Sequence, residues 1–155
     1  MNTKPTLFHD IDGVLYGLYD DEFQLRPGVK PWLKWAHENF EVVWLTTWEP
    51  EKIKTLLSVI FAEKYLKALP VIPVVCAEWK LCESKAAWLQ QTIGQRPELD
   101  WYWIDDDMST KELEVNQLPK ERCIQVSPKG AGVLKELREE LEKLRHEEVV
   151  KTVAG

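Results

Sequence analysis

Two aspartates one residue apart, Asp10 and Asp12, interrupt the stretch LFHDIDGVLYG near the N-terminus. Carboxylates this close raise each other's pKa, and neither side chain belongs in a hydrophobic core. The residues before Asp10 form a short apolar run typical of a β-strand, which places both acids at its C-terminal tip. The spacing therefore indicates a functional site at a strand end.

A second acidic run, Asp105, Asp106 and Asp107, ends another expected strand in the stretch WYWIDDD. Carboxylates that converge on one edge repel each other unless a cation lies among them, and Mg²⁺ is a hard divalent ion that takes oxygen ligands. Asp10 with Asp105 or Asp106 therefore predicts a magnesium site, and the spacing leaves open which of the three consecutive acids binds the metal. The competing interpretation is a helix cap or a solvated acidic loop.

Thr46 and Lys85 are the candidate ligands for a phosphate group. Thr46 follows the β-branched and aromatic run EVVWL, and its hydroxyl suits a phosphoryl oxygen. Lys85 lies near an expected helix start and offers positive charge to offset that of a transferring group. Lys80 is a rival for this role, and helix-start placement favours Lys85.

Apolar runs alternate with helical patterns along the chain. Such alternation is typical of an α/β fold in which helices cover both faces of a mostly parallel sheet. Ligands gather at the C-terminal ends of the strands in such sheets, and the acids and the threonine named above fall at such ends. We expect a Rossmann-like three-layer sandwich with strands at 6–9, 41–46, 101–107 and 123–126 and helices at 29–40, 51–66, 84–92 and 130–150.

Two other stretches carry loop signals. Residues 19–28 (YDDEFQLRPG) are polar and are expected to form a loop. Residues 69–75 (LPVIPVV) are apolar but contain two prolines, so any strand there is short or lies at a sheet edge.

The bulk composition limits the class of protein. With 155 residues, 45% hydrophobic and 30% charged, the chain fits a single soluble domain over 1–155. A net charge of −6 argues against non-specific binding to nucleic acid, although a local basic groove is compatible with it. Three irregularly spaced cysteines predict no disulfide framework, and no stretch suits a signal peptide or a membrane span, so we expect a cytoplasmic protein with no membrane role.

The order of these motifs resembles the haloacid dehalogenase (HAD) superfamily of phosphohydrolases. The family's motifs are DxDGxL/T, a strand ending in Ser or Thr, a lysine, and a strand ending in an acid pair. Here they read D10-I-D12-G-V-L, VVWLT46, Lys85 and WYWID105-D106, which together span about residues 6–128. The resemblance implies a HAD-like domain, which the helix expected from apolar spacing at about 130–150 follows.

The resemblance also implies roles for these residues. Asp10 would be the nucleophile that forms an aspartyl-phosphate, and Asp12 the general acid and base. Thr46 and Lys85 would hold the phosphate. Mg²⁺ would be bound by Asp10, by the backbone carbonyl of Asp12, and by Asp106 or Asp105, in a phosphoric monoester hydrolase.

There is little room for the cap domain with which HAD enzymes normally enclose small substrates. A minimal or absent cap leaves an open site that suits a nucleotide, a nucleic-acid end or a phosphoprotein. The motifs also resemble those of small capless HAD proteins associated with phage and with nucleic-acid repair. Trp48 and Trp79 either line the entrance and stack a base or pack in the core, and the bulk of their rings favours the core.

Other interpretations stay open at this point. A HAD fold kept as a non-catalytic binding or assembly module is the main alternative; a receiver domain fits poorly because its acid pair follows the first strand. The oligomeric state is open, and the apolar residues of 133–144 either dimerise or, as the short run favours, cover the sheet. His9 should point to the opposite side of the sheet from Asp10, and we assign it no role.

Overall fold

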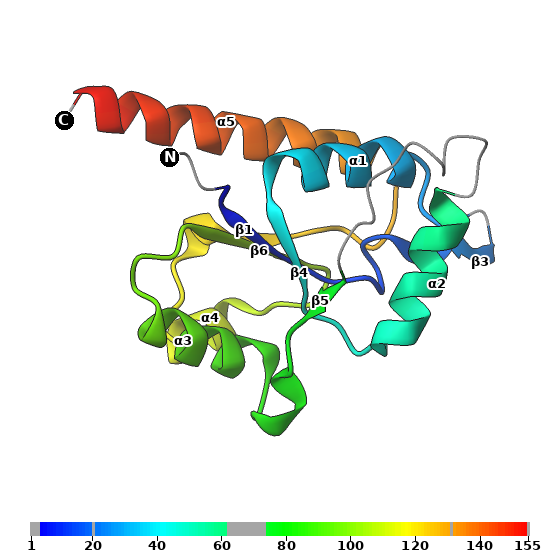
Figure 1. The fold of residues 1–155 in the computed structure, drawn as a ribbon, viewed down its shortest axis with the longest axis horizontal. Coiled ribbons are helices and arrows are strands. Elements are labelled where there is room, and N and C mark those ends of the chain that lie inside the picture. The colour runs from blue at the N-terminus through cyan, green and yellow to red at the C-terminus, as the bar shows by residue number, and fades with distance from the viewer. Residues whose placement is uncertain (1–3, 20, 62–73, 131, 155) are drawn as a thin grey trace.

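The computed structural model describes residues 4–19, 21–61, 74–130 and 132–154. Strands and helices alternate along the chain and end in one long helix (Figure 1). In chain order the elements are β1 (Thr6–His9), β2 (Tyr16–Tyr19), β3 (Glu22–Leu25), α1 (Val29–Asn39), β4 (Glu41–Trp44), α2 (Pro50–Ile60), β5 (Val75–Cys76), the 3₁₀ turn η1 (Trp79–Leu81), α3 (Lys85–Gln95), β6 (Trp101–Asp105), α4 (Thr110–Val115), the 3₁₀ turn η2 (Lys120–Arg122), β7 (Cys123–Gln125) and α5 (Val133–Ala154).

The main sheet has five parallel strands in the order β5-β4-β1-β6-β7. The central strand β1 pairs with β4 on one side and with β6 on the other. In this register His9, the last residue of β1, lies opposite Trp44 and Ile104. Because all five strands run in the same direction, the segments that follow β1, β4 and β6 leave the sheet at one edge. This edge is where the candidate site residues were expected.

Helices cover both faces of this sheet. Leu33 of α1, Ile53 of α2 and Leu137 of α5 pack into one buried cluster, whereas Leu89 of α3 and Leu113 of α4 belong to a second cluster. Figure 1 shows the layers, with α1 and α5 above the sheet and α3 and α4 below it. The predicted three-layer α/β fold with a parallel sheet is therefore confirmed.

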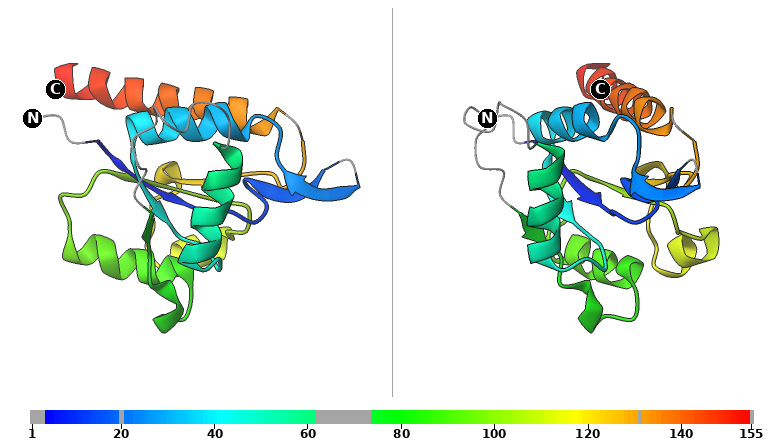
Figure 2. Two further views of the ribbon diagram at one scale, coloured as in Figure 1. Left: turned by 45° about the vertical axis from the view of Figure 1, so that its right-hand side comes forward. Right: turned by 90° about the vertical axis from the view of Figure 1, so that its right-hand side faces the viewer.

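The prediction of a loop over 19–28 is wrong at Tyr19 and at Glu22–Leu25, which lie in the strands β2 and β3 of a β-hairpin. β2 and β3 pair in antiparallel register, with Leu18 opposite Phe23. Phe23 and Leu25 alternate with polar residues, which is a strand signal, but the neighbouring aspartates and Pro27 are typical of loops and obscure it. The hairpin projects from the sheet beside α2 (Figure 2).

The helix expected at 84–92 is confirmed as α3. Its N-cap is Ser84, whose hydroxyl accepts a hydrogen bond from the Ala87 N–H at 3.0 Å. An N-cap hydroxyl satisfies one of the free N–H groups of the first turn. The helix therefore begins at Lys85, directly beside the C-terminal edge of the sheet.

The segment between α2 and α3 agrees with expectation as far as the structure describes it. The helix expected at 51–66 is observed as Pro50–Ile60, and the end of that prediction lies outside the described residues. The same is true of 69–73, whereas Val75–Cys76 form a two-residue strand at the sheet edge. A short edge strand is what the prolines of this stretch predict.

The last helix, α5, covers the sheet. It spans Val133–Ala154, where 130–150 was expected, and Leu134, Leu137 and Leu141 are all buried in the first core cluster. The apolar stripe of α5 is therefore buried in the core of the domain. This is the outcome predicted by the interpretation in which 133–144 covers the sheet. Among the described residues, no helix is both long enough and apolar enough to cross a membrane.

Candidate active site

Three carboxylates meet at the C-terminal edge of the sheet. Asp10 directly follows β1, Asp105 ends the neighbouring strand β6, and Asp106 comes next. Oxygen atoms of these three side chains all lie within 4.8 Å of one another. Asp10 is 3% exposed and Asp105 is 1% exposed, so their charges are poorly screened by water. The structure thus brings together one acid of the first motif, Asp10, and two of the second, Asp105 and Asp106.

Lys85 is the cation beside this group. Its Nζ lies 3.2 Å from Asp10 Oδ1 and 2.8 Å from Asp105 Oδ2. Burial disfavours the charged ammonium, but the two carboxylates outweigh burial and raise the pKa of Lys85. The rival Lys80 pairs instead with Glu49 at 3.2 Å, and both of those side chains are exposed. Of the two candidate lysines, only Lys85 contacts the acids.

One ammonium does not balance three carboxylates. Burial, and then the charge of Asp105, raise the pKa of Asp10 to about 8. Burial also raises the pKa of Asp106. A divalent cation would supply the missing positive charge, and carboxylate oxygens are the hard ligands that Mg²⁺ takes. The donor set therefore fits a magnesium ion.

The three consecutive acids differ in how free they are to bind a metal. Both oxygens of Asp105 already accept hydrogen bonds, from Lys85 Nζ and from the Asp107 N–H at 3.0 Å. Asp107 is exposed and lies outside the three-carboxylate group. The carboxylate of Asp106 lies so close to Gly13 that a Cβ there would stand 2.0 Å from Asp106 Oδ2. Gly13 also has a φ of +76°, which favours glycine.

The acidic run does not act as a helix cap. The helix that follows it, α4, has Ser109 as its N-cap, and the Ser109 hydroxyl accepts a hydrogen bond from the Glu112 N–H at 3.0 Å. Burial of Asp105 also excludes a fully solvated loop. The stretch DDDMS therefore caps the following helix, as the competing interpretation predicted, but it does so through Ser109, and the buried Asp105 is neither the cap nor solvated.

Asp12 stands apart from the three-carboxylate group. Its side chain is exposed, and its Oδ1 accepts a hydrogen bond from the indole N–H of Trp48 at 2.9 Å. The side chain of Asp12 is thus turned towards Trp48, in the segment after β4. Ligation of a metal through the backbone carbonyl of Asp12 stays a prediction.

Thr46 lies at the same edge, two residues after β4, and is 5% exposed. Its hydroxyl accepts a hydrogen bond from the Trp48 N–H at 3.3 Å, and its carbonyl accepts one from the Trp79 indole at 2.9 Å. Lys85 Nζ lies 5.7 Å from the centre of a Trp79 ring. Trp48 and Trp79 therefore flank Thr46, and both are only partly buried.

The residues that meet at this edge follow the order of the motifs along the chain, and a family model matches them. The model that describes the HAD domain in Swiss Army Knife RNA repair proteins matches residues 6–136. The chain belongs to this HAD family. No curated protein and no solved structure matches it significantly. The expected resemblance is confirmed at the level of family.

His9 is a residue of this HAD domain to which the sequence assigned no role. It is fully buried on the α1 side of the sheet, where the Trp32 indole N–H donates to its Nε2 at 2.9 Å. The ring proton is therefore on Nδ1, which donates to the Asp10 carbonyl at 2.5 Å. Burial lowers the pKa of His9 to about 3, so the ring is neutral. The His9 ring therefore holds the Asp10 carbonyl in place. This role depends on the contact with Trp32, which is distant along the chain, so local sequence does not indicate it.

Arg26 is a second residue that the sequence did not single out. Its guanidinium is buried, and Nη2 donates to the carbonyls of Gly13 at 2.9 Å and Ser127 at 2.6 Å. Its Nε donates to the Tyr19 hydroxyl at 2.8 Å. Arg26 therefore ties the hairpin and the segment after β7 to the turn that carries Gly13. Its place within an expected loop concealed this role.

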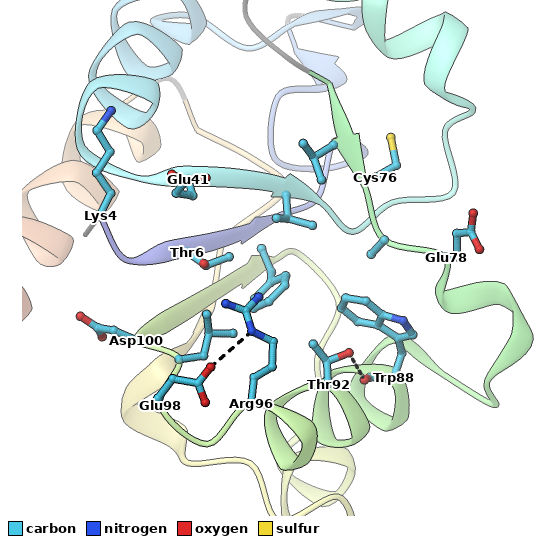
Figure 3. A pocket seen from close by; sticks show the side chains of 15 residues that line it. Lys4, Thr6, Glu41, Cys76, Glu78, Trp88, Thr92, Arg96, Glu98 and Asp100 are labelled. Carbon is cyan, nitrogen blue, oxygen red and sulfur yellow. Dashed lines mark hydrogen bonds and ion pairs between the residues drawn. The ribbon is translucent and has the colours of Figure 1, made fainter. Parts of the chain in front are cut away.

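A cavity of about 820 Å³ lies between the sheet and α3 (Figure 3). Phe8 and Trp88 are among its apolar lining residues, and Arg96 and Glu98 on its wall pair with each other at 3.6 Å. None of the three clustered carboxylates lines it. The cavity therefore has no part in the candidate active site of this HAD domain.

Proposed function

We propose that this HAD domain is a Mg²⁺-dependent phosphatase that removes the phosphate from the end of a nucleic acid through an aspartyl-phosphate on Asp10. The observation that carries the proposal is the buried group of Asp10, Asp105 and Asp106 with Lys85 in contact. In a chain of the HAD family, this arrangement supports phosphoryl transfer to a carboxylate.

In the first step, a carboxylate oxygen of Asp10 attacks the phosphorus of a phosphate monoester. The bond between phosphorus and the leaving oxygen breaks, and Asp12 donates its proton to that oxygen, which leaves as an alcohol. The exposed position of the Asp12 carboxyl, turned away from the three-carboxylate group, supports this role. The ammonium of Lys85 and the hydroxyl of Thr46 hold the phosphoryl oxygens.

In the second step, water attacks the phosphorus of the aspartyl-phosphate. Asp12 accepts a proton from this water, and the bond between phosphorus and the Asp10 oxygen breaks. Inorganic phosphate leaves, and both side chains return to their starting state. Asp10, Asp106 and the backbone carbonyl of Asp12 would hold a magnesium ion, which would supply positive charge to offset the carboxylates and the phosphate.

Two observations support a nucleic-acid end as the substrate. The matching family model describes domains of RNA repair proteins. Among the described residues, the β2–β3 hairpin lies between β1 and α1, and only α2, the sheet strand β5 and the turn η1 lie between β4 and α3, so neither place holds a separate cap domain. An open edge of this kind can accept the terminus of a long molecule. The phosphate that is removed would be the terminal phosphate of that nucleic acid.

A non-catalytic binding or assembly module is the less favoured candidate. Burying several carboxylates around one ammonium is costly to stability, and proteins tolerate such costs chiefly at functional sites. All of the family's motif residues are present and lie at one edge. A module that only binds would have no need of them.

Hydrolysis of phosphorylated oligonucleotides with and without Mg²⁺ tests the proposal. Asp10→Asn should lower kcat by about 10³-fold or more, because the nucleophile is lost, and omission of Mg²⁺ should have a similar effect. Lys80→Ala is the matched control for Lys85→Ala: removing Lys85 should reduce turnover by about 100-fold or more, and removing the exposed Lys80 should not. Turnover that survives Asp10→Asn would contradict the nucleophile assignment.

A further inference from the structure

Three aromatic side chains lead outward from Asp12. The Trp48 indole donates to the Asp12 carboxylate, and the ring of Tyr16 meets Trp48 edge-on with centroids 5.8 Å apart. Phe23 stacks on Tyr16 with centroids 6.5 Å apart and an angle of 21° between the rings, and it is 74% exposed. We propose that Trp48, Tyr16 and Phe23 form a stacking platform for the terminal nucleobase of the phosphorylated strand. This inference rests on the proposed function.

The chemistry of Asp12 fixes which part of a substrate meets the platform. A carboxyl that protonates the leaving oxygen lies beside the leaving group. The indole N–H of Trp48 donates a hydrogen bond to that carboxyl. The atoms beyond the leaving oxygen therefore pass along Trp48. The hairpin is held at the same point, because the Gly13 N–H donates to the Tyr16 carbonyl at 2.8 Å. The platform is thus continuous with the site.

A cavity of about 470 Å³ lies beside the platform, between the hairpin and α2. Tyr16, Leu25 and Trp48 line one side, and α2 residues including Leu56 and Val59 line the other. This lining is predominantly apolar and suits the flat face of a base. A base that enters the cavity would contact the ring of Tyr16 or Trp48.

Charge distinguishes this side of Trp48 from the opposite side. On the hairpin side, Glu51 is paired with Lys54 at 3.1 Å, and Lys52 forms no ion pair with any residue that the structure describes. Lys52 is therefore available to a phosphodiester of the same strand. On the opposite side, a cavity of about 380 Å³ between Trp48 and Trp79 is lined by Glu49, Glu78 and Lys80, and Lys80 is already paired with Glu49. An anionic strand is favoured on the hairpin side.

The platform recognises a base without reading its identity. Every nucleobase has a π-face, so stacking on aromatic side chains is tolerant of sequence. Removing one stacking contact typically weakens binding roughly fivefold to 150-fold. We therefore expect a preference for a terminal nucleotide that carries a base over an abasic one, with little difference among the four bases.

Binding and turnover are measured separately, so that the platform and the phosphatase proposal can fail independently. The Asp10→Asn variant keeps a bound substrate intact. Its affinity for labelled single strands with a 3′- or a 5′-terminal phosphate is measured by fluorescence anisotropy, with either a normal or an abasic terminal nucleotide. At the preferred terminus, the base-bearing strand should bind about tenfold or more tightly. Adding Phe23→Ala should reduce that preference at least several-fold, and adding Phe23→Tyr should retain it.

Leu81→Ala is the matched control, because Leu81 is also an exposed apolar side chain (90% exposed) but lines the cavity on the Trp79 side. It should leave the preference for a base unchanged. Equal binding of base-bearing and abasic strands, absence of binding to either terminus, or a preference lost in Leu81→Ala and kept in Phe23→Ala would overturn the platform. Turnover by the wild-type protein with no base preference would support the phosphatase alone, and base preference without turnover would support the platform alone.

Discussion

Asp10 is the residue that we assign as nucleophile. In the metal-free protein, its ionised form lowers the stability of the folded state. Its burial and the neighbouring Asp105 raise its pKa to about 8, from an ordinary value of 3.8. Between these two values the folded protein holds a proton that the unfolded chain releases. The free energy of unfolding therefore falls as pH rises from about 4 to about 8.

Asp10→Asn removes this titration, so it should stabilise the metal-free protein increasingly as pH rises through that window. At pH 8 in a chelator, we expect a Tm above that of the wild type by more than about 3 °C, roughly 1 kcal/mol for a domain of this size. At the acid end of the window the two proteins should unfold at similar temperatures. Asp107→Asn, at an exposed acid outside the group, is the control. A Tm difference for Asp10→Asn that does not change with pH would contradict the assignment of a raised pKa.

Gly13 gives a second prediction at this scale. A Cβ there would stand 2.0 Å from Asp106 Oδ2 in a backbone conformation with φ of +76°. Gly13→Ala should displace Asp106 and weaken Mg²⁺ binding by about tenfold or more, because a carboxylate ligand moves away. Gly94→Ala, in α3 with open space around the added methyl group, should leave Mg²⁺ affinity unchanged. Titration calorimetry measures both, and equal affinities for the two variants would refute the close approach.

Single residues also show where prediction from sequence stops. Asp10 and Asp106 could be found because acids at the ends of neighbouring parallel strands must meet. His9 and Arg26 could not, because their roles depend on partners distant in the chain: Trp32 for His9, and Ser127 for Arg26. Nothing in local spacing indicates those contacts.

At the scale of elements, α5 belongs to the same core as the rest of the domain. The family match ends at residue 136. Leu137 and Leu141 lie beyond it, yet their side chains are only 3% and 0% exposed. Arg145 of the same helix also pairs with Asp100, the residue directly before β6, at 2.6 Å. The helix is therefore anchored to the sheet by packing and by an ion pair.

Leu141→Ala should consequently destabilise the domain by about 2–5 kcal/mol, as expected for a fully buried leucine. Glu140→Ala, at the adjacent exposed position, should change stability by less than about 0.5 kcal/mol. Urea denaturation of both variants measures the difference. A cost for Leu141→Ala as small as that of the control would show that α5 is dispensable.

The elements that were predicted and those that were missed differ in a physical way. The parallel strands and the larger helices could be predicted because their apolar periodicity reflects burial against the core. The β2–β3 hairpin carries only a weak signal: it is partly exposed, and Phe23, its clearest strand residue, points largely to solvent. The short helix α4 was missed for a related reason, since Leu113 is its only residue in the core.

At the scale of the whole molecule, the net charge of −6 limits how a nucleic acid can be bound. An acidic protein cannot track a long phosphate backbone through many contacts, so recognition should concentrate on the strand end. Lys85 at the phosphate and Lys52 beside the hairpin are the cations that we assign to the strand. The footprint should be about one or two nucleotides.

The salt dependence of binding tests this footprint. With two phosphate contacts, the logarithm of the affinity of Asp10→Asn for a phosphorylated single strand should fall with log[salt] at a slope of about −1.4. Lengthening the strand should change neither the slope nor the affinity appreciably. A slope that steepens with strand length would instead show an extended basic path on the protein.

The central claim is that Asp10 becomes phosphorylated during turnover. The most direct measurement is to quench the reaction with acid in the presence of Mg²⁺, reduce with borohydride, and map the product by peptide mass spectrometry. Reduction of an aspartyl-phosphate converts that aspartate to homoserine. We predict homoserine at position 10, dependent on both substrate and Mg²⁺. Turnover accompanied by homoserine at another aspartate, or by a phosphorylated residue of another type, would contradict the account.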